Sequence, residues 1–149
     1  QTPKRERLDR LAHRLPSPVP LGFDPACISW VTDRIGITAV DGVDDALDEG
    51  FFVINVADEI WNDANEKVSI EPYSGTVLQA LDEVDELVRQ VLTTSGRKVV
   101  IHCAMGMERS VLAVVWYLHR TGGLSLDEAY DAVCRARPIA QDRRAWIKS

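Results

Sequence analysis

Apolar residues recur with a helical period in three segments of the chain. Between positions 76 and 92 they fall on every third or fourth residue, as Val77, Ala80, Leu81, Val84, Leu87, Val88 and Val91. This spacing predicts an amphipathic helix with one buried face. Positions 109–120 are almost all apolar, so a helix there is expected to be buried on every side. Ser125 and Glu128 have the spacing of a capping box, which predicts a helix from there to about Arg137.

Shorter apolar runs separate these helices and predict strands at positions 27–31, 34–39, 51–55, 67–70 and 98–101. Two brief helical segments are expected at 43–49 and 141–147. Helices that alternate with strands favour an α/β fold, because a crossover helix returns the chain to a parallel neighbouring strand. The sequence therefore predicts a single domain with a central, largely parallel sheet and helices on both faces.

The first 22 residues differ from the rest of the chain. Three leucines lie at helical spacing among charged residues, and three prolines then break any helix; they are Leu8, Leu11, Leu15, Pro16, Pro18 and Pro20. We expect a basic amphipathic arm and a proline-rich linker over 1–22, and a single folded domain over 23–149. The arm either docks on the domain or on a partner, or stays free.

Charge is unevenly distributed along the 149 residues, which carry a net charge of −6. Positions 1–14 hold five basic residues against two acidic ones, whereas positions 41–86 hold fourteen carboxylates against Lys67 alone. An acidic surface argues against a nucleic-acid partner, because the phosphate backbone requires positive charge. No apolar stretch is long enough to span a membrane. The oligomeric state stays open.

The three cysteines are odd in number and widely spaced, as Cys27, Cys103 and Cys134. This pattern fits a reducing compartment better than a disulfide framework, so we expect a cytoplasmic location. The three histidines show no pair at helical spacing, and no two cysteines form a Cys-x-x-Cys motif. A metal site is therefore not expected, and no cofactor is required by the chemistry proposed below.

The most informative segment reads His-Cys-Ala-Met-Gly-Met-Glu-Arg-Ser at positions 102–110, between a predicted strand and a predicted helix. A strand that turns sharply into a helix leaves several backbone N–H groups pointing into one concavity, which suits a phosphate group. Gly106 gives the loop backbone freedom. The guanidinium of Arg109 can hold two phosphate oxygens at once. The expected phosphate-binding residues are Ala104, Met105, Gly106, Met107, Glu108 and Arg109.

Cys103 opens this loop and is the expected nucleophile. Surrounding N–H groups and Arg109 favour the thiolate, so the pKa of Cys103 should lie below that of a free thiol. A thiolate that faces a bound phosphate is an activated nucleophile. Ser110 can donate a hydrogen bond to the sulfur and help it to leave, although a serine at this position can also serve as an ordinary helix cap.

Positions 102–110 resemble the active-site loop of the cysteine-dependent protein tyrosine phosphatases, and their flanks resemble the small dual-specificity branch. The resemblance covers roughly positions 26–147. Its softer features are a strand that ends in Asn-Val-Ala at 55–57 and a helix that ends in Arg-Pro at 137–138. It implies a phosphomonoester hydrolase that forms a cysteinyl-phosphate intermediate. It also implies that His102 orients the loop, although a buried, hydrogen-bonded histidine has much the same appearance.

The resemblance also implies an aspartate that protonates the leaving group, roughly thirty residues before the cysteine. Positions 69–73 contain no aspartate, and Glu71 is the only carboxylate there. Asp63 and Asp58 are alternatives if the loop is longer than usual. Glu108, inside the loop, is another candidate, unless it points outward and pairs with a basic side chain.

Several functions remain open at this stage. The leading one is a protein phosphatase acting on phosphotyrosine and phosphoserine or phosphothreonine. A lipid, sugar or nucleotide phosphate is an alternative substrate, so the partner is a phosphorylated protein or a small phosphomonoester. A non-catalytic phosphate-binding pseudophosphatase, or a sulfur- or arsenate-handling enzyme on a rhodanese-like or low-molecular-weight phosphatase scaffold, would use the same loop.

Overall fold

Residues 19–148 are described by the computed structural model of the chain. The arm predicted at 1–22 lies mostly outside these residues, so its form and the boundary at residue 23 stay predictions. No helix in the described part is long and apolar enough to cross a membrane.

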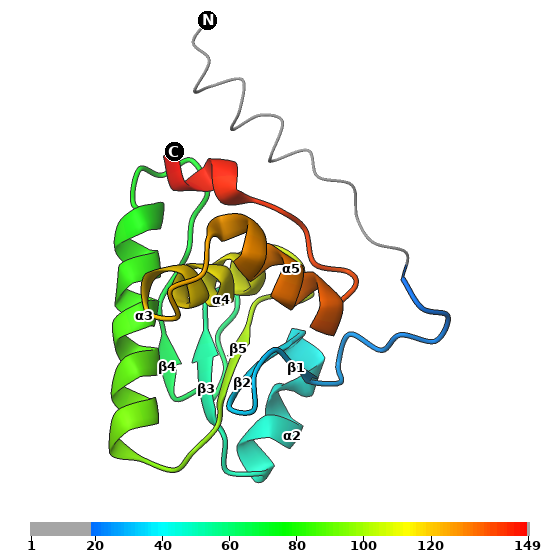
Figure 1. The fold of residues 1–149 in the computed structure, drawn as a ribbon. Coiled ribbons are helices and arrows are strands. Elements are labelled where there is room, and N and C mark those ends of the chain that lie inside the picture. Colours follow the sequence, from blue (N-terminus) through cyan, green and yellow to red (C-terminus); the bar gives the residue numbers. More distant parts are fainter. Residues whose placement is uncertain (1–18, 149) are drawn as a thin grey trace, which may run out of the picture.

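Five strands form one sheet in the order β1-β2-β5-β3-β4 (Figure 1). Their bounds are β1 Ser29–Trp30, β2 Ile35–Thr38, β3 Phe52–Asn55, β4 Glu66–Lys67 and β5 Val99–His102. β5 runs parallel to β2 on one side and to β3 on the other, and β4 runs parallel to β3, whereas β1 is antiparallel to β2. The carboxyl ends of four strands therefore meet at one edge of the sheet, as Figure 1 shows.

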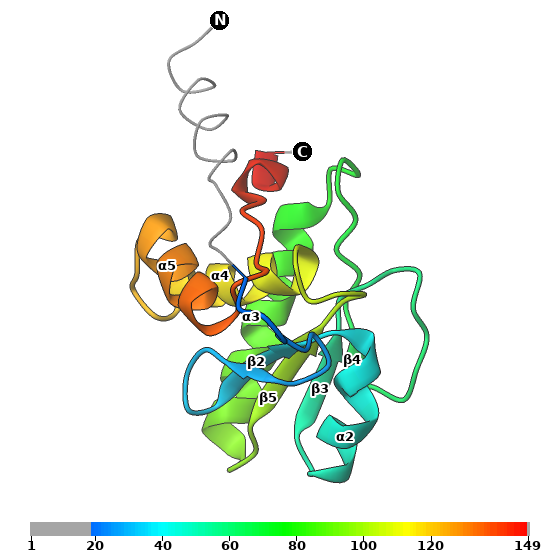
Figure 2. The ribbon, with the colours of Figure 1, turned by 90° about the vertical axis from the view of Figure 1, so that its right-hand side faces the viewer.

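Helices cover both faces of this sheet, as the sequence predicted. α3 (Val77–Thr94) and α4 (Arg109–Arg120) pack together on one face, and α5 (Leu126–Ala136) packs against α4. The short η1 (Val40–Gly42) leads into α2 (Val43–Asp48), and α2 covers the other face next to β3 (Figure 2). The C-terminal η2 (Arg144–Lys148) lies against α3.

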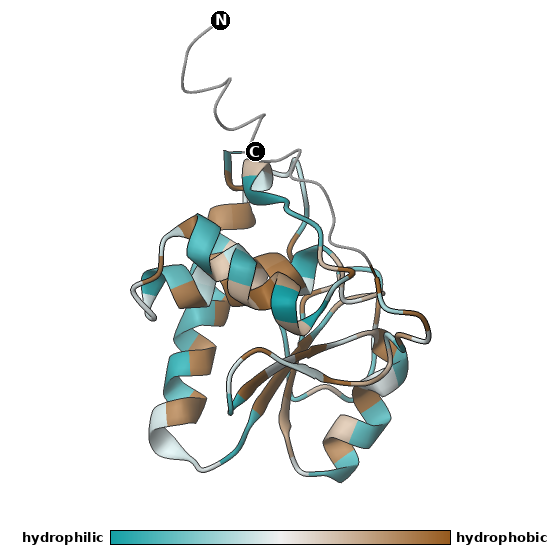
Figure 3. Ribbon diagram, turned by 45° about the vertical axis from the view of Figure 1, so that its right-hand side comes forward, coloured by the Kyte–Doolittle hydropathy of each residue, from teal (hydrophilic) through white to brown (hydrophobic). Residues whose placement is uncertain are grey.

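The central strand β5 is buried on both faces. Its side chains alternate, so that Val99 and Ile101 join the larger core with α3 and α4, and Val100 joins a smaller core with α2. Figure 3 shows the strands and α4 as mostly hydrophobic, whereas α3 and α5 carry hydrophilic outer faces. A strand enclosed in this way is a rigid base for the loop that follows it.

The helices predicted at 43–49, 76–92, 109–120 and 125–137 agree with the observed ones to within two residues, whereas the segment predicted at 141–147 begins three residues later, at Arg144. The capping box at the start of α5 is confirmed, because Ser125 Oγ accepts from the Glu128 N–H at 3.1 Å and the Glu128 carboxylate accepts from the Ser125 N–H at 2.9 Å. The strand predicted at 27–31 is shorter, and the one predicted at 67–70 shares only Lys67 with β4, which is Glu66–Lys67. Both β1 and β4 are edge strands that pair with one neighbour each.

Candidate active site

The loop 103–108 joins β5 to α4 at the carboxyl edge of the sheet. Cys103 follows β5 directly and is only 3% exposed. It lies in a hollow of about 70 Å³ whose lining also includes Ala104, Met105, Met107, Glu108 and Arg109. A hollow of this size holds a tetrahedral anion and little more of a substrate.

The hydrogen bonds around Cys103 favour its thiolate. Burial alone would raise the pKa of the thiol, but the Ser110 hydroxyl and the backbone N–H groups of Ser110, Gly106 and Glu108 outweigh it. The pKa of Cys103 therefore lies below its ordinary value. Cys103 Sγ is 3.1 Å from Ser110 Oγ, at the first turn of α4. The loop thus offers the sulfur several donors, as an anion requires.

His102 connects the base of the loop to a second segment. Its ring is fully buried, and burial lowers its pKa. Nδ1 is 3.1 Å from the Cys103 carbonyl oxygen, and Nε2 is 3.1 Å from Asn62 Nδ2. Because a carbonyl only accepts, Nδ1 carries the proton and Nε2 accepts from the Asn62 amide. His102 is therefore neutral near pH 7 and ties the 57–65 segment to the loop.

Arg109 is engaged by a carboxylate that the sequence analysis did not single out. Its two terminal nitrogens lie 2.6 and 2.8 Å from the carboxylate oxygens of Glu59. The hydrogen bond from Arg109 is the largest cause that lowers the pKa of Glu59 to about 2. The carboxylate occupies the guanidinium fork in the geometry that two phosphate oxygens would use. Glu59 is one of several carboxylates in a polar stretch, and spacing alone does not distinguish it.

Side chains from β3 and β4 fix the shape of the segment that carries Glu59. Asn55 donates to the Ile60 carbonyl at 2.7 Å and accepts from the Ala57 N–H at 2.8 Å. Lys67 Nζ donates to the Ala57 carbonyl at 2.7 Å and lies 4.0 Å from the centre of the Trp61 ring. The segment 57–62 is therefore held against the loop from the neighbouring strands.

Comparison with known proteins decides the family. The family "Dual specificity phosphatase, catalytic domain" matches residues 48–149, more than half of the chain. The chain belongs to this family. The family inferred from the loop motif is therefore confirmed, and the chain is a dual specificity phosphatase domain by family.

Curated relatives carry related names but are longer. "Dual specificity protein phosphatase 1" of Arabidopsis thaliana is 36% identical over 70 residues, which cover 47% of this chain and 33% of the relative. A putative tyrosine phosphatase of Invertebrate iridescent virus 6 is 29% identical over 89 residues, covering 60% of this chain and 58% of the relative. The dual specificity phosphatase domain thus spans about a third to three fifths of the length of these two relatives.

Solved structures share the fold. Human DUSP28 has a TM-score of 0.71 at 22% identity, with 89% of this chain and 92% of that chain covered. Tk-PTP in its active form has a TM-score of 0.67 at 23% identity, with 81% and 91% covered. The α/β phosphatase fold predicted from the sequence is confirmed.

The carboxylates considered as proton donors differ in their surroundings. Glu71, Asp63 and Asp58 are exposed, and none of them lines the hollow at Cys103. Glu108 lines it, but its carboxylate accepts from Arg143 Nε at 2.6 Å. Glu108 therefore has the outward ion pair that the sequence analysis gave as one alternative.

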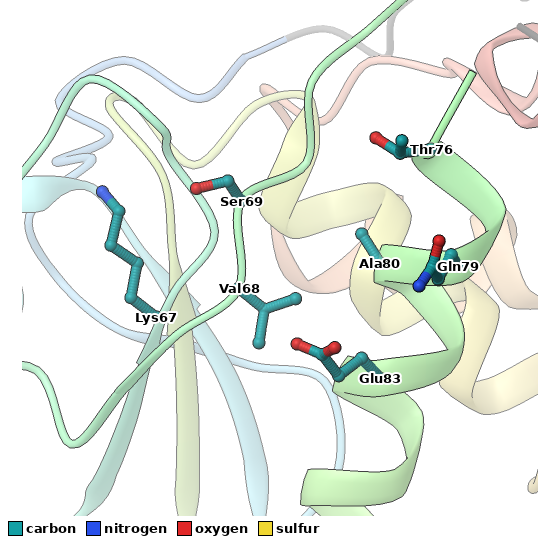
Figure 4. A pocket seen from close by; sticks show the side chains of 7 residues that line it. All are labelled: Lys67, Val68, Ser69, Thr76, Gln79, Ala80 and Glu83. Carbon is teal, nitrogen blue, oxygen red and sulfur yellow. The ribbon is translucent and has the colours of Figure 1, made fainter. Parts of the chain in front are cut away.

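A second, larger hollow of the dual specificity phosphatase domain is separate from the loop. It has a volume of about 310 Å³ between residues 67–69 and α3, where Gln79 and Glu83 face it (Figure 4). Its lining shares no residue with the 103–109 loop. Among residues 19–148 no group of three histidine, cysteine, aspartate or glutamate side chains is arranged to hold a metal ion.

Proposed function

We propose that this domain hydrolyses phosphomonoesters through a phosphate bound covalently to Cys103. The observation that carries the proposal is a thiol of lowered pKa that shares a phosphate-sized hollow with Arg109. The Cys103 thiolate attacks phosphorus and forms an S–P bond while the ester P–O bond breaks. The departing oxygen takes up a proton. Water then attacks the phosphorus, and the sulfur leaves as a thiolate that accepts a hydrogen bond from Ser110.

Substrate binding involves an exchange at Arg109. In the free domain its guanidinium is bound to Glu59, so the phosphate must replace this carboxylate. A dianionic phosphate competes better than a monoanion, because it brings more charge to the same fork. The released Glu59 loses the hydrogen bond that lowers its pKa. Because an incoming anion must displace the Glu59 carboxylate from Arg109, Glu59 weakens the binding of anions that carry little charge.

We retain Glu71 as the leading candidate for the proton donor. It lies on the exposed turn between β4 and α3, and among the described residues its carboxylate has no hydrogen bond or ion pair to give up. Asp63 and Asp58 remain alternatives. The ion pair with Arg143 makes Glu108 the weakest of the four candidates.

The proposed substrates are proteins phosphorylated on tyrosine, serine or threonine. The names of the relatives support this class. The small hollow is compatible with this class, because it has room for the phosphate group and little more of the substrate. We propose a cytoplasmic location on the basis of the three cysteines, which form no disulfide bond.

A comparison of substrates tests this function. The purified domain and its Cys103→Ser variant are given an aryl phosphate, phosphotyrosine and phosphothreonine peptides, and a panel of lipid, sugar and nucleotide phosphates. We expect Cys103-dependent release of phosphate from both kinds of peptide. If the domain hydrolyses only a lipid, sugar or nucleotide phosphate, that compound and not a phosphorylated protein is the substrate. Phosphate binding without any turnover would instead identify a pseudophosphatase.

A further inference from the structure

Arg137, the residue after α5, lies beneath the loop that holds Cys103. Its side chain is fully buried. Two of its nitrogens donate to loop carbonyl groups, at 2.7 Å to Gly106 and 3.0 Å to Met105. The same guanidinium also donates to the Pro25 carbonyl at 2.8 Å and to Ser29 Oγ at 2.9 Å. One side chain thus connects the end of α5, the start of β1 and the loop.

These hydrogen bonds determine which way the loop peptides face. In a planar trans peptide the C=O and the following N–H point in opposite directions. Because Arg137 binds the Met105 carbonyl, the Gly106 N–H points away from Arg137, and this N–H is one of the donors to the Cys103 sulfur. The hydrogen bond from Arg137 to the Gly106 carbonyl likewise directs the Met107 N–H away from Arg137.

The loop backbone approaches this guanidinium too closely for a side chain. A Cβ atom added at Gly106 would lie 2.6 Å from Arg137 Nη2. Gly106 also has a φ of 69°, in the region that favours glycine. The glycine in the motif therefore serves the contact with Arg137 as well as the turn.

The charge of Arg137 has no carboxylate partner among residues 19–148, since every acceptor it binds is a carbonyl or a hydroxyl oxygen. Burial lowers its pKa to about 10, so it remains a cation near pH 7. A buried cation without a neighbouring anion favours negative charge nearby. The Cys103 thiolate is one such charge, and it stabilises the cation in return.

We propose that Arg137 is a positioning residue, which holds the loop peptides with their N–H groups toward the Cys103 sulfur and the phosphate, and supplies positive charge beneath them. This rests on the proposed role of the loop. The arginine expected from the motif, Arg109, contacts the anion from the open side, whereas Arg137 acts from inside the protein through the Met105 and Gly106 peptides.

The test compares Arg137→Lys and Arg137→Met with the original protein. The readouts are the pH dependence of Cys103 alkylation by iodoacetamide, followed by mass spectrometry, and the protection of Cys103 by inorganic phosphate. We expect Arg137→Met to raise the apparent pKa of Cys103 by about one unit and to weaken phosphate protection about tenfold. Arg137→Lys should give values between those of the original protein and Arg137→Met, because lysine keeps the positive charge and lacks the forked guanidinium group.

Arg135→Met is the matched control, because Arg135 is exposed on α5 only two residues before Arg137, and it should leave both readouts unchanged. If the Arg137 variants do not fold, the Ser29→Ala variant tests the proposal instead. It removes a hydrogen-bond acceptor of Arg137 that is not part of the loop. It should shift the alkylation profile in the same direction by a smaller amount. Chemical unfolding of each variant confirms that it is folded.

Two failures can be told apart. If Cys103 of the original protein shows an ordinary pKa and no protection by phosphate, the proposed role of the loop is wrong. If the original protein behaves as expected and folded Arg137→Met matches it in both readouts, the proposal for Arg137 is overturned. An unchanged profile in Ser29→Ala, where only that variant folds, overturns it as well.

Discussion

Cys103 should react faster with iodoacetamide than Cys27, although Cys27 is the more exposed of the two. Cys27 is exposed, but the neighbouring Asp24 carboxylate raises its pKa, whereas hydrogen bonds hold the pKa of the buried Cys103 below its ordinary value. Because only the thiolate reacts, Cys103 should be alkylated faster at pH 7, and its rate should level off at a lower pH. Peptide mass spectrometry measures both rates. Asp24→Asn should accelerate Cys27 alone; faster labelling of Cys27 in the original protein would contradict the assignment.

Glu59→Gln should increase the affinity of the domain for phosphate. The substitution removes the negative charge that competes for Arg109 and keeps the size of the side chain. Since the carboxylate of this pair is more than half exposed, we expect a gain of only about two- to fivefold. Protection of Cys103 from alkylation by increasing phosphate gives the affinity. Asp58→Asn changes the same charge at the adjacent residue and should have little effect; an equal gain there would point to a general charge effect.

Glu71→Gln tests the proton donor through the leaving group. Loss of the donor should lower the rate about 10²–10⁴-fold on an alkyl phosphate and far less on nitrophenyl phosphate, whose leaving oxygen needs little protonation. Steady-state rates on the two substrates give the comparison. Asp63→Asn and Glu108→Gln are the controls. If either control shows the leaving-group-dependent loss and Glu71→Gln does not, the proton comes from that residue instead.

At the scale of elements, an internal ion pair anchors the C-terminal segment next to the loop. Arg144 bonds to Asp142 at 2.8 Å and to Asp127 at 2.7 Å, and the side chains of Arg144 and Asp142 are 2% and 1% exposed. Arg144→Met would leave Asp142 buried without its partner, so we expect a loss of about 3–5 kcal/mol in the free energy of unfolding. Urea denaturation measures it.

The adjacent arginine provides the control for this loss. Arg143 pairs with Glu108 near the surface, where ion pairs contribute less than about 1 kcal/mol. Arg143→Met should therefore destabilise the domain much less than Arg144→Met. Equal losses would mean that burial of Arg144 does not determine the stability of this segment.

Helices were easier to predict than strands, for a physical reason. The apolar period of α3 and the capping box of α5 are local signals, so both helices could be located from neighbouring residues. The length of β1 or β4 depends on which strand lies beside it, and no local pattern contains that information. Both strands were therefore predicted too long.

The same distinction holds for the site. Cys103 and Arg109 belong to one continuous motif and could be recognised in the sequence. Glu59, Asn62 and Arg137 come from other segments, and only the fold brings them to the loop. Glu59 and Asn62 stand in an ordinary polar stretch, and the Arg-Pro end of the helix at 137–138 was noted only as part of the family resemblance. Spacing alone therefore could not assign a role to any of the three.

At the scale of the whole molecule, the fold gathers three separate segments around one end of β5. The 57–65 segment follows β3, the loop follows β5, and Arg137 follows α5. β5 lies between β2 and β3 and is buried on both faces, so Cys103 directly follows the most enclosed strand of the sheet. The proposed chemistry therefore depends on the packing of the entire domain and not on the nine-residue motif alone.

The formation of a phosphoryl–cysteine tests the central claim most directly. The domain is mixed with nitrophenyl phosphate, and the reaction is stopped by acid within the first turnover. We expect a burst of nitrophenolate of about one equivalent per protein, and a single phosphoryl group on the Cys103 peptide by mass spectrometry. Cys103→Ser should show neither. Steady turnover without a burst or an adduct, or turnover that persists in Cys103→Ser, would contradict a mechanism through this thiolate.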